Sequence, residues 1–526
     1  MARTMQSIQP RAPDKPSSLG LKRTTAHIEV PDGSGQALFY ARQSFCFLVP
    51  THPTKLPLRP PGGSPKGKIM IALSRKRAKM AAMKSPQEMR SEQRTESAFP
   101  LESSELHRTE FSILGEHTPV GLSESEAAPN HRGGAQTTRN DRRPAGTFYE
   151  FFAGGGMARA GLGDNWDCLF ANDLSPQKAA SYAKNWGGTH LKVADVAALT
   201  TADLPGLADL AWASFPCQDL SLAGAGAGLS GVRSGTFWPF WDLIKTLRHE
   251  NRAPSVVVLE NVCGALSSHS GKDFAAISDA LASNEYRFGA VVINAAKFVP
   301  QSRPRLFIIG FDRSISLPET LTNASPSASW HTTSLIEAHS KLSQNAKDAW
   351  VWWHLPTPPN RTTIFADLVE SKPDGVKAHT ASETMKLLGM MTPLNIAKVE
   401  AAKRAGKRMV GTVYKRTRPT GPEGRKEQRA EIRFDDIAGC LRTPTGGSSR
   451  QTIMIVEGNR VSSRLLSPRE AARLMGLPDT YLLPEKYNDA YHLAGDGVAV
   501  PVVRFLAEHL LEPLLIAARR FNEAAA

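Results

Sequence analysis

Residues 147–156 read TFYEFFAGGG, an apolar run of strand length followed at once by three glycines. A buried strand that ends in glycines and opens a helix is typical of nucleotide-type α/β folds, because glycine lets the backbone approach a ligand closely. The pattern is not G-x-G-x-x-G, so it favours a nucleoside ligand without a pyrophosphate. Asp173 follows Gly154 by 19 residues, an offset that suits a ribose hydroxyl pair. Taken alone, a tight packing turn with a surface aspartate explains this segment equally well.

The surrounding sequence continues an α/β rhythm. Further apolar runs of strand length occupy residues 168–171, 210–215, 256–259 and 306–310, and helical stretches such as 237–247 separate them. The rhythm returns at residues 461–526, where Ser467-Pro468-Arg469-Glu470 forms a capping box with proline at the first helical position. Strands that alternate with helices predict a mostly parallel sheet covered on both faces.

Two segments depart from this rhythm. Residues 312–460 contain proline-rich turns, a tryptophan cluster at 350–353 and basic stretches such as 414–418, which predict a separate, smaller mixed domain. Residues 1–146 lack periodicity and are rich in Pro, Ser, Arg and Thr, a composition that predicts a disordered basic N-terminal tail. A translation start later than Met1 is an alternative interpretation of this tail.

The bulk composition limits the partners. A net charge of +14 and a pI of about 9.6 favour a polyanion, although residues 1–146 alone hold 22 Lys and Arg against 13 Asp and Glu. The five cysteines form no CxxC pair, so neither a metal site nor a disulfide framework is expected. No run reaches the roughly 18 apolar residues of a membrane span, and no secretory leader is evident, so we expect a cytoplasmic protein.

Residues 214–218 read SFPCQ and place Cys217 just past a strand, where α/β sheets form their ligand crevices. Cysteine is a strong nucleophile as its thiolate. Pro216 fixes the turn, and the glycine-rich residues 223–231 predict a mobile loop that could close over a substrate. A buried, inert cysteine is the alternative.

Two further candidates lie at strand ends. Glu260 ends an apolar strand, where a carboxyl group in an apolar crevice can stay protonated and act as a general acid. Arg303 and Arg305 alternate on an extended segment and therefore point the same way, which suits a carbonyl oxygen or a phosphate. A surface capping glutamate and a solvated sheet edge are the alternatives.

Together and in this order, these segments resemble the cytosine carbon-5 DNA methyltransferase family, in its prokaryotic or phage single-domain type. The resemblance covers residues 147–311 and 461–526, and residues 464–476 and 495–501 resemble the family's ninth and tenth motifs. It implies a Rossmann-like class I methyltransferase core that depends on S-adenosylmethionine, with a target-recognition domain at residues 312–460.

The resemblance also implies roles. Cys217 would attack carbon 6 of a flipped-out cytosine, Glu260 would stabilise ring nitrogen 3, Arg305 would hold the cytosine carbonyl, and Arg303 would position it or a phosphate. The implied cofactor site consists of Phe152 against the adenine, Asp173 at the ribose and Asp195 at the adenine amino group, together with Gly154, Gly156, Pro216, Asp496 and Val498.

Several positions depart from the family pattern. Glu150 stands where aspartate is common, Met157 where glycine is common, and Leu174 where an aromatic residue is usual. Asp496-Gly497 replaces Asn-Ser, which predicts weaker contacts to the cofactor carboxylate and a repulsive aspartate unless that side chain points away.

The resemblance implies double-stranded DNA as substrate, a monomer, and a cognate restriction endonuclease as a candidate partner. Methylation of transfer RNA is an alternative, because relatives with the same motifs act on it. A catalytically silent DNA-binding protein is a second alternative. A third alternative, a nicotinamide-dependent oxidoreductase, is supported by the glycine turn alone, and this hypothesis leaves the other motifs unexplained.

Overall fold

The computed structural model describes residues 145–217, 228–231, 233–420, 425–441 and 450–525. The tail expected at residues 1–146 lies almost wholly outside this range, as does most of the glycine-rich stretch 223–231. Along the described chain, no helix is both long and apolar enough to cross a membrane.

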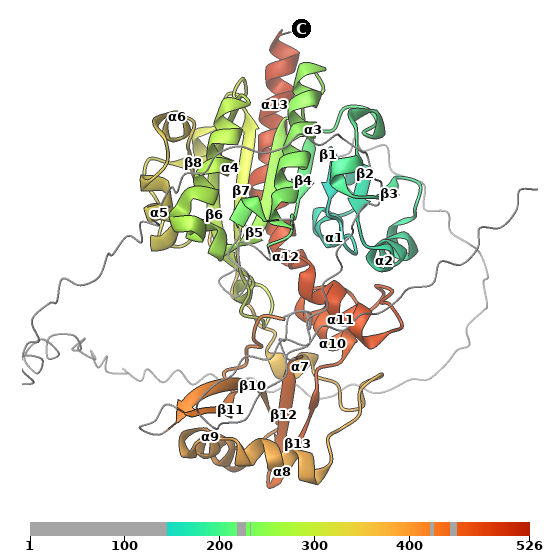
Figure 1. Ribbon diagram of the computed structural model, residues 1–526, viewed down its shortest axis with the longest axis vertical. Helices are drawn as coiled ribbons and strands as arrows, with labels where there is room; N and C mark the ends of the chain where they lie inside the picture. Colours follow the sequence, from blue (N-terminus) through green and yellow to red (C-terminus); the bar gives the residue numbers. More distant parts are fainter. Residues whose placement is uncertain (1–144, 218–227, 232, 421–424, 442–449, 526) are drawn as a thin grey trace, which may run out of the picture. The chain divides into compact units, whose positions relative to one another are not determined.

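The main architectural element is a seven-stranded sheet with the order β3-β2-β1-β4-β5-β7-β6 (Figure 1). Neighbouring strands are parallel except around β7, which runs antiparallel to both β5 and β6. The expected α/β fold with a mostly parallel sheet is therefore confirmed. The strands are β1 (Gly146–Phe151), β2 (Trp166–Asp173), β3 (Leu191–Val193), β4 (Leu210–Ala213), β5 (Val256–Val262), β6 (Tyr286–Asn294) and β7 (Pro304–Asp312).

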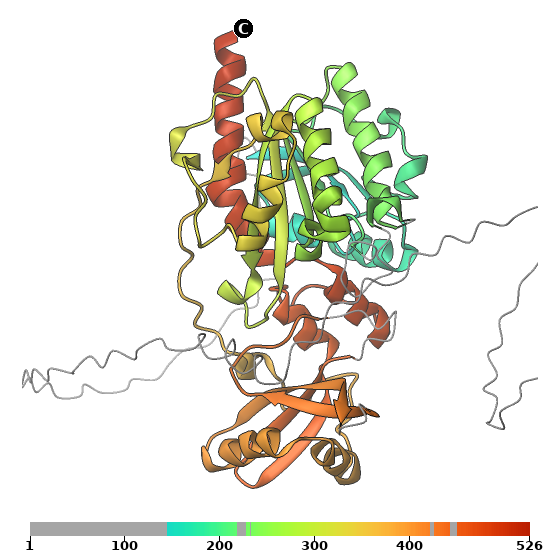
Figure 2. The same cartoon turned by 60° about the vertical axis from the view of Figure 1, so that its left-hand side comes forward.

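Alternation along the strands builds a core on each face of this sheet, because successive side chains in a strand point to opposite sides. Val256 and Val258 of β5 belong to one core, whereas Val257 and Leu259 belong to the other. The first core is covered by α1 (Met157–Leu162), α12 (Val500–Leu506) and α13 (Glu512–Ala525), and the second by α3 (Phe237–His249) and α4 (Lys272–Ser283) (Figures 1 and 2). The C-terminal helices thus complete a sheet that begins at residue 146.

Three further helices pack together, since the last of them contacts both of the others. Helix α2 (Pro176–Trp186) starts after Ser175, whose hydroxyl accepts a hydrogen bond from the Lys178 backbone N–H. Helix α10 (Pro468–Leu474) has the predicted capping box between Ser467 and Glu470. Helix α11 (Tyr487–Asp496) follows and leads into α12.

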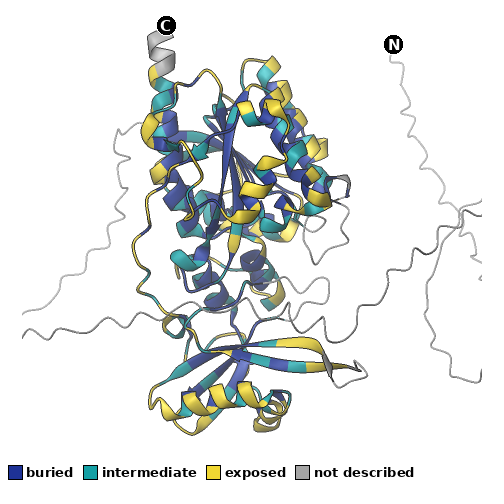
Figure 3. Ribbon diagram, turned by 90° about the vertical axis from the view of Figure 1, so that its left-hand side faces the viewer, coloured by how far each residue is buried: buried dark blue, intermediate teal, exposed yellow. Residues whose placement is uncertain are grey.

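A second, four-stranded sheet has the order β11-β10-β12-β13 and is antiparallel throughout. It consists of β10 (Met409–Thr420), β11 (Arg425–Arg433), β12 (Thr452–Glu457) and β13 (Arg460–Leu465), with α8 (Ala381–Gly389) and α9 (Pro393–Arg404) packed against it. Its small core includes Val413, Ile432 and Met454. Figure 3 shows that the strands of the large sheet are buried, whereas the outer part of the β10–β11 hairpin is exposed.

The packing does not follow the boundaries expected at residues 312 and 460. Strands β8 (Thr322–Asn323) and β9 (Trp352–Trp353) and helices α5 (Thr333–Ser340) and α6 (Gln344–Asp348) lie against the large sheet, where Val351 N–H donates to Phe288 O at 2.8 Å. The physical reason is that the tryptophan cluster supplies the apolar surface that covers β6. Conversely, β13 pairs with β12, so residues 460–465 belong to the smaller sheet.

Candidate active site

The candidate site residues meet at one edge of the large sheet. The glycine turn follows β1, Asp173 ends β2, Asp195 follows β3, Cys217 follows β4, and Glu260 lies near the end of β5. These five strands are parallel, so their carboxyl ends share an edge, and β1 lies beside β4, where the strand order reverses. Strand β7 is antiparallel, so its first residues, including Arg305, lie at the same edge.

The glycine turn has one open face and one packed face. Gly154 adopts φ +58°, and a Cβ added there would meet nothing within 4 Å. Gly156 adopts φ +76°, and a Cβ there would overlap the Trp186 indole. Phe152, just before the turn, holds φ +57°, a strained conformation for a side chain of its size. Gly154 is thus open to a ligand, whereas Gly156 is required by conformation and packing.

Asp173 is held in one orientation by the backbone. Its Oδ2 accepts a hydrogen bond from Gly154 N–H at 2.8 Å, and its Oδ1 accepts one from Ser175 N–H at 2.7 Å. Asp195 is more exposed, and its Oδ1 accepts from Ala197 N–H at 3.0 Å at the start of a 3-10 turn. Asp173 is the last residue of β2 and Asp195 follows β3, so both carboxylates lie at the same edge of the sheet as the glycine turn.

Cys217 is half-buried at the end of a braced loop. Pro216 O accepts a hydrogen bond from Ser234 Oγ at 2.9 Å, and Phe215 O accepts one from Asn261 Nδ2 at 3.2 Å. Burial raises the pKa of the Cys217 thiol; the Arg305 guanidinium opposes this effect, whereas the carboxylates of Glu260 and Asp496 add to it. The thiol is therefore surrounded by charges from β5, β7 and α11.

Glu260 and Arg305 form a nearly buried ion pair. Arg305 Nε lies 3.2 Å from Glu260 Oε1, and their side chains are 15% and 8% exposed. The antiparallel register, in which Arg305 faces Val262, places the two side chains on adjoining strands two residues apart. The sequence argument expected Glu260 in an apolar crevice and Arg305 on the substrate carbonyl, so this pairing was not anticipated.

Arg303 has a different environment from the one expected. Its side chain is buried, and its Nη2 donates to Gly495 O at 2.8 Å and to Gly497 O at 2.6 Å. Burial lowers its pKa, and the nearby Arg305 lowers it further. The expectation that Arg303 and Arg305 face a substrate together is corrected: Arg303 is a positioning residue that fixes the turn between α11 and α12.

Two departures from the family pattern explain each other. A Cβ at Gly497 would overlap the Met157 sulfur, and Gly497 has an ordinary φ of −73°. Glycine is therefore required at residue 497 by space rather than by backbone conformation. Val498 beside it is buried in the core.

The other departures have distinct environments. Asp496 pairs with Lys178, whose Nζ lies 2.7 Å from Asp496 Oδ2. Glu150 is buried, and that burial raises its pKa to about 8. Leu174, in contrast, is 67% exposed.

Three contributors were missed by the sequence argument. Tyr481 and Trp186 both brace the glycine turn, because Tyr481 Oη donates to Gly155 O at 2.7 Å and Trp186 Nε1 donates to the same oxygen at 3.0 Å. Lys178 reaches Asp496 across 318 positions of sequence. No local sequence signal marks any of these contacts, since each partner lies in a distant segment.

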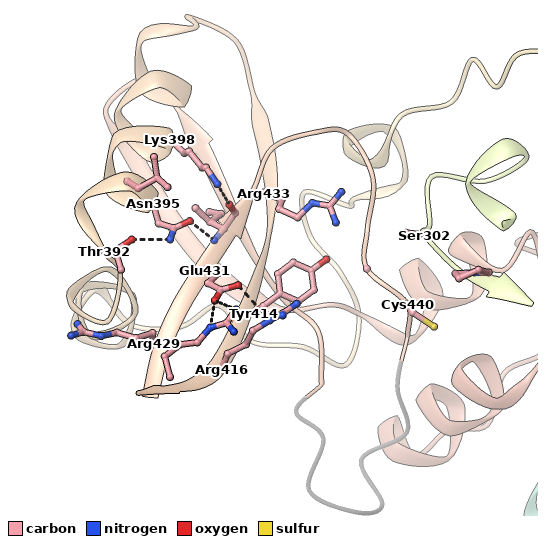
Figure 4. A pocket seen from close by; sticks show the side chains of 15 residues that line it. Ser302, Thr392, Asn395, Lys398, Tyr414, Arg416, Arg429, Glu431, Arg433 and Cys440 are labelled. Carbon is pink, nitrogen blue, oxygen red and sulfur yellow. Dashed lines mark hydrogen bonds and ion pairs between the residues drawn. The ribbon is translucent and has the colours of Figure 1, made fainter. Parts of the chain in front are cut away.

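A basic cleft of about 740 Å³ lies on the smaller sheet (Figure 4). Tyr414 and Arg433 extend from this sheet toward the side on which Ser302 and Cys440 lie. Arg418 Nε and Nη2 donate to Glu431 Oε1 at 2.8 and 2.6 Å, and Arg416 lies 3.4 Å from the other oxygen of the same carboxylate. The cationic side chains that line the cleft are Lys398, Arg416, Arg418, Arg429 and Arg433.

No metal centre is evident in the part of the chain that the structure describes, since no three His, Cys, Asp or Glu side chains gather to hold an ion. The edge instead combines an open glycine turn, two oriented carboxylates, a thiol and a carboxylate–guanidinium pair. This set suits nucleophilic attack by sulfur on a polar ring held beside a nucleoside-bearing cofactor.

Comparison with known proteins gives a consistent result. The type II methyltransferase M.HpaII of Haemophilus parainfluenzae is 26% identical over 388 residues, which cover 70% of this chain and 90% of the relative. M.HhaI of Haemophilus parahaemolyticus is 26% identical over 365 residues, which cover 69% and 93%. The solved S. pombe Dnmt2 methyltransferase has 18% identity and a TM-score of 0.43, with 70% and 99% covered. The family model for C-5 cytosine-specific DNA methylase matches residues 146–512, and the chain therefore belongs to that family.

Proposed function

We propose that this protein transfers a methyl group from S-adenosylmethionine to carbon 5 of cytosine in duplex DNA, through a covalent intermediate on Cys217. The observation that carries the proposal is the placement of Cys217 and the Glu260–Arg305 pair at the same sheet edge as the open glycine turn. The family match argues against a nicotinamide-dependent oxidoreductase, which rested on the glycine turn alone.

The residues present suit this cofactor. The open face of Gly154 leaves room for a nucleoside, and the Asp173 carboxylate is already oriented by two backbone N–H groups, so it can accept ribose hydroxyls. In this proposal Phe152 contacts the adenine ring and Asp195 accepts its amino group. Gly156, Pro216 and Val498 shape the walls of the site without contributing polar side chains. When bound, the cofactor supplies an electrophilic methyl group on a sulfonium sulfur.

The chemical steps follow from the side chains. The Cys217 thiolate forms a bond to carbon 6 of cytosine, and the electron pair of the C5–C6 double bond moves toward carbon 5. Glu260 holds ring nitrogen 3 and stabilises the charge that develops on the ring. Arg305 fixes the Glu260 carboxylate and can reach the adjoining ring carbonyl. Methyl transfer to carbon 5 would break the methyl–sulfonium bond and leave S-adenosylhomocysteine. Carbon 5 then loses its proton to solvent, the electron pair re-forms the C5–C6 double bond, and Cys217 leaves carbon 6 as the thiolate.

The target carbon is inaccessible within stacked DNA, so the cytosine must leave the helix at a cost of a few kcal/mol. The cleft on the smaller sheet suits duplex DNA, because its arginines can contact phosphates and base edges. A dedicated reading domain of this kind favours DNA over transfer RNA as substrate. The similarity of the chain to type II methyltransferases makes a cognate restriction endonuclease a candidate partner.

A mechanism-based trap tests the proposal. Fluorine at carbon 5 cannot be removed as a proton can, so duplex DNA containing 5-fluorocytosine should form a stable adduct with the protein. We expect a denaturation-resistant adduct that requires S-adenosylmethionine and is absent in Cys217→Ala, while Cys263→Ala serves as the matched control. An adduct that survives in Cys217→Ala would refute the assigned nucleophile. If an adduct forms with 5-fluorocytosine RNA but not with DNA, the substrate is RNA. If no adduct forms with either, the result favours a catalytically silent DNA-binding protein.

A further inference from the structure

The ion pair between Lys178 and Asp496 has a position that the steps above do not use. Lys178 lies on α2 just after Asp173, and Asp496 is the last residue of α11. The two side chains are 26% and 41% exposed, so a ligand can reach both. Burial alone would lower the pKa of Lys178, but the carboxylates of Asp496 and Asp173 together raise it. The Asp496 carboxylate also raises the pKa of Cys217. The pair therefore lies within electrostatic reach of both the ribose carboxylate and the nucleophile.

This location matches one part of the proposed cofactor. Its sulfur carries three substituents: the ribose carbon, the methyl group and the amino-acid chain. If the ribose lies at Asp173 and the methyl group points toward a cytosine on Cys217, the amino-acid chain takes the third direction, and the Lys178–Asp496 pair is placed to receive it. That chain ends in a zwitterion, with one carboxylate and one ammonium group. A lysine and an aspartate side by side offer the complementary two charges without adding net charge.

We propose that Lys178 and Asp496 form a charge clamp for the amino-acid end of the cofactor, in which Lys178 binds the α-carboxylate and Asp496 the α-ammonium group. The proposal rests on the proposed function, because it assumes S-adenosylmethionine in this site. It gives the aspartate at residue 496 a role: the repulsion expected between Asp496 and the cofactor carboxylate is offset by Lys178. In the free protein the two side chains pair with each other, with Lys178 Nζ 2.7 Å from Asp496 Oδ2. Ligand binding exchanges this internal ion pair for two ion pairs with the ligand.

The competing explanation is that the Lys178–Asp496 ion pair has a purely structural role as a strut, that is, it only holds α2 against α11. Other contacts already join α2 to the segment just before α11. Asn185 Nδ2 donates to Leu482 O at 3.0 Å, Asn185 Oδ1 accepts from Leu482 N–H at 2.8 Å, and Tyr481 and Trp186 both donate to Gly155 O. Loss of the ion pair should therefore leave the helices in place. The clamp and the strut also differ in which ligands they affect.

The test measures dissociation constants by titration calorimetry for two probes, S-adenosylhomocysteine and 5′-methylthioadenosine. The second probe has the nucleoside and the sulfur but no amino-acid end. Lys178→Met keeps most of the unbranched apolar side chain and removes its charge. We expect this variant to bind S-adenosylhomocysteine about tenfold more weakly and methylthioadenosine within about twofold of wild type. Lys245→Met, which breaks an exposed Lys–Asp pair on α3, is the matched control and should change neither constant.

Asp496→Asn provides a second variant that preserves shape. It should weaken S-adenosylhomocysteine binding selectively. The double variant should lose less than the sum of the two single losses, because the two side chains contact each other and hold the same amino-acid end of the ligand. Equal losses for both probes, or no loss for either, would overturn the clamp. If wild type binds neither probe, the proposed cofactor is itself wrong, which is a different outcome. Unfolding temperatures of all variants without ligand verify that each is folded.

Discussion

The candidate site at the edge of the large sheet and the basic cleft on the smaller sheet hold their charged side chains in opposite ways. At the edge, Arg303 is buried and donates to carbonyls of the turn after α11, and Arg305 pairs with Glu260 at 15% and 8% exposure. In the cleft, Arg418 and Glu431 are paired at 50% and 30% exposure, and both lie on the same sheet. A buried charge that loses its partner is strongly destabilising, whereas an exposed pair contributes about 0–1 kcal/mol. The charges at the edge are therefore fixed by folding, whereas the cleft arginines can exchange partners at little cost, as the proposed DNA binding would require.

The largest expected effect comes from breaking the charged pair at the edge. Glu260→Gln preserves the shape of the side chain but removes the carboxylate proposed to stabilise the cytosine ring, so methylation of duplex DNA should fall about 10²- to 10⁴-fold. The same change removes a carboxylate that raises the pKa of Cys217. Because the thiolate is the reactive form, alkylation of Cys217 by iodoacetamide should then begin at lower pH than in wild type.

Methylation is expected to fall while alkylation of Cys217 becomes easier. An unfolded variant would not show this combination, so the two measurements separate loss of chemistry from loss of folding. Methylation is measured by transfer of labelled methyl groups, and alkylation by peptide mapping across a pH series. An alkylation profile that does not shift, or methylation that is retained, would contradict the assigned role of Glu260. Glu285→Gln, which breaks the exposed Arg313–Glu285 pair, is a suitable control.

An intermediate effect is expected from the packing at the same edge. Gly497→Ser restores the residue common in the family but places a side chain against Met157, so the free energy of unfolding should fall by about 1–3 kcal/mol. Met157→Ala makes room for the serine at the expense of its own buried contacts. The double variant should therefore be more stable than the sum of the two single changes predicts.

Urea unfolding of the four proteins in this cycle gives the coupling free energy directly. Strict additivity would show that the two residues do not share space. The matched control is Gly389→Ser at the end of α8, because a Cβ at Gly389 would meet nothing within 4 Å and its φ is not left-handed.

The smallest effect on stability is expected in the cleft. Arg418→Ala removes an exposed pair, so the free energy of unfolding should change by less than about 1 kcal/mol. Its effect should emerge in DNA binding: the slope of log affinity against log salt should decrease by about one if Arg418 neutralises a phosphate. Fluorescence anisotropy with a labelled duplex across a salt series measures this slope.

The matched control is Arg313→Ala, which breaks an Arg–Glu pair that is also exposed and lies just past the end of β7, at the opposite edge of the large sheet. It should leave the salt slope unchanged. Glu431→Gln frees both Arg416 and Arg418 and should tighten non-specific binding. If Arg418→Ala and Arg313→Ala behave alike, the cleft is not the DNA-binding surface.

Much of the catalytic architecture follows from short-range sequence patterns. The run at residues 147–152 became β1, the run at 256–259 became part of β5, and the Ser467–Glu470 capping box begins α10 as predicted. Apolar periodicity and capping depend on residues a few positions apart, so they can be identified in one sequence. Placement of candidate residues directly after parallel strands then predicts that they share an edge, which holds for Asp173, Cys217 and Glu260.

The sequence could not determine which distant groups meet. That Arg303 holds the carbonyls of residues 495 and 497, that Lys178 pairs with Asp496, and that Met157 fills the space beside Gly497 all depend on contacts across more than 190 positions. The sequence argument assigned the tryptophan cluster to the smaller domain, yet the cluster covers β6. A large apolar surface could pack against either sheet, and the sequence does not say which. The sequence by itself thus determined the candidate reacting groups and the strands at whose ends they lie. Only the tertiary structure decided the partners of each charge, since ion pairs and close packing depend on position in space and not on spacing along the chain.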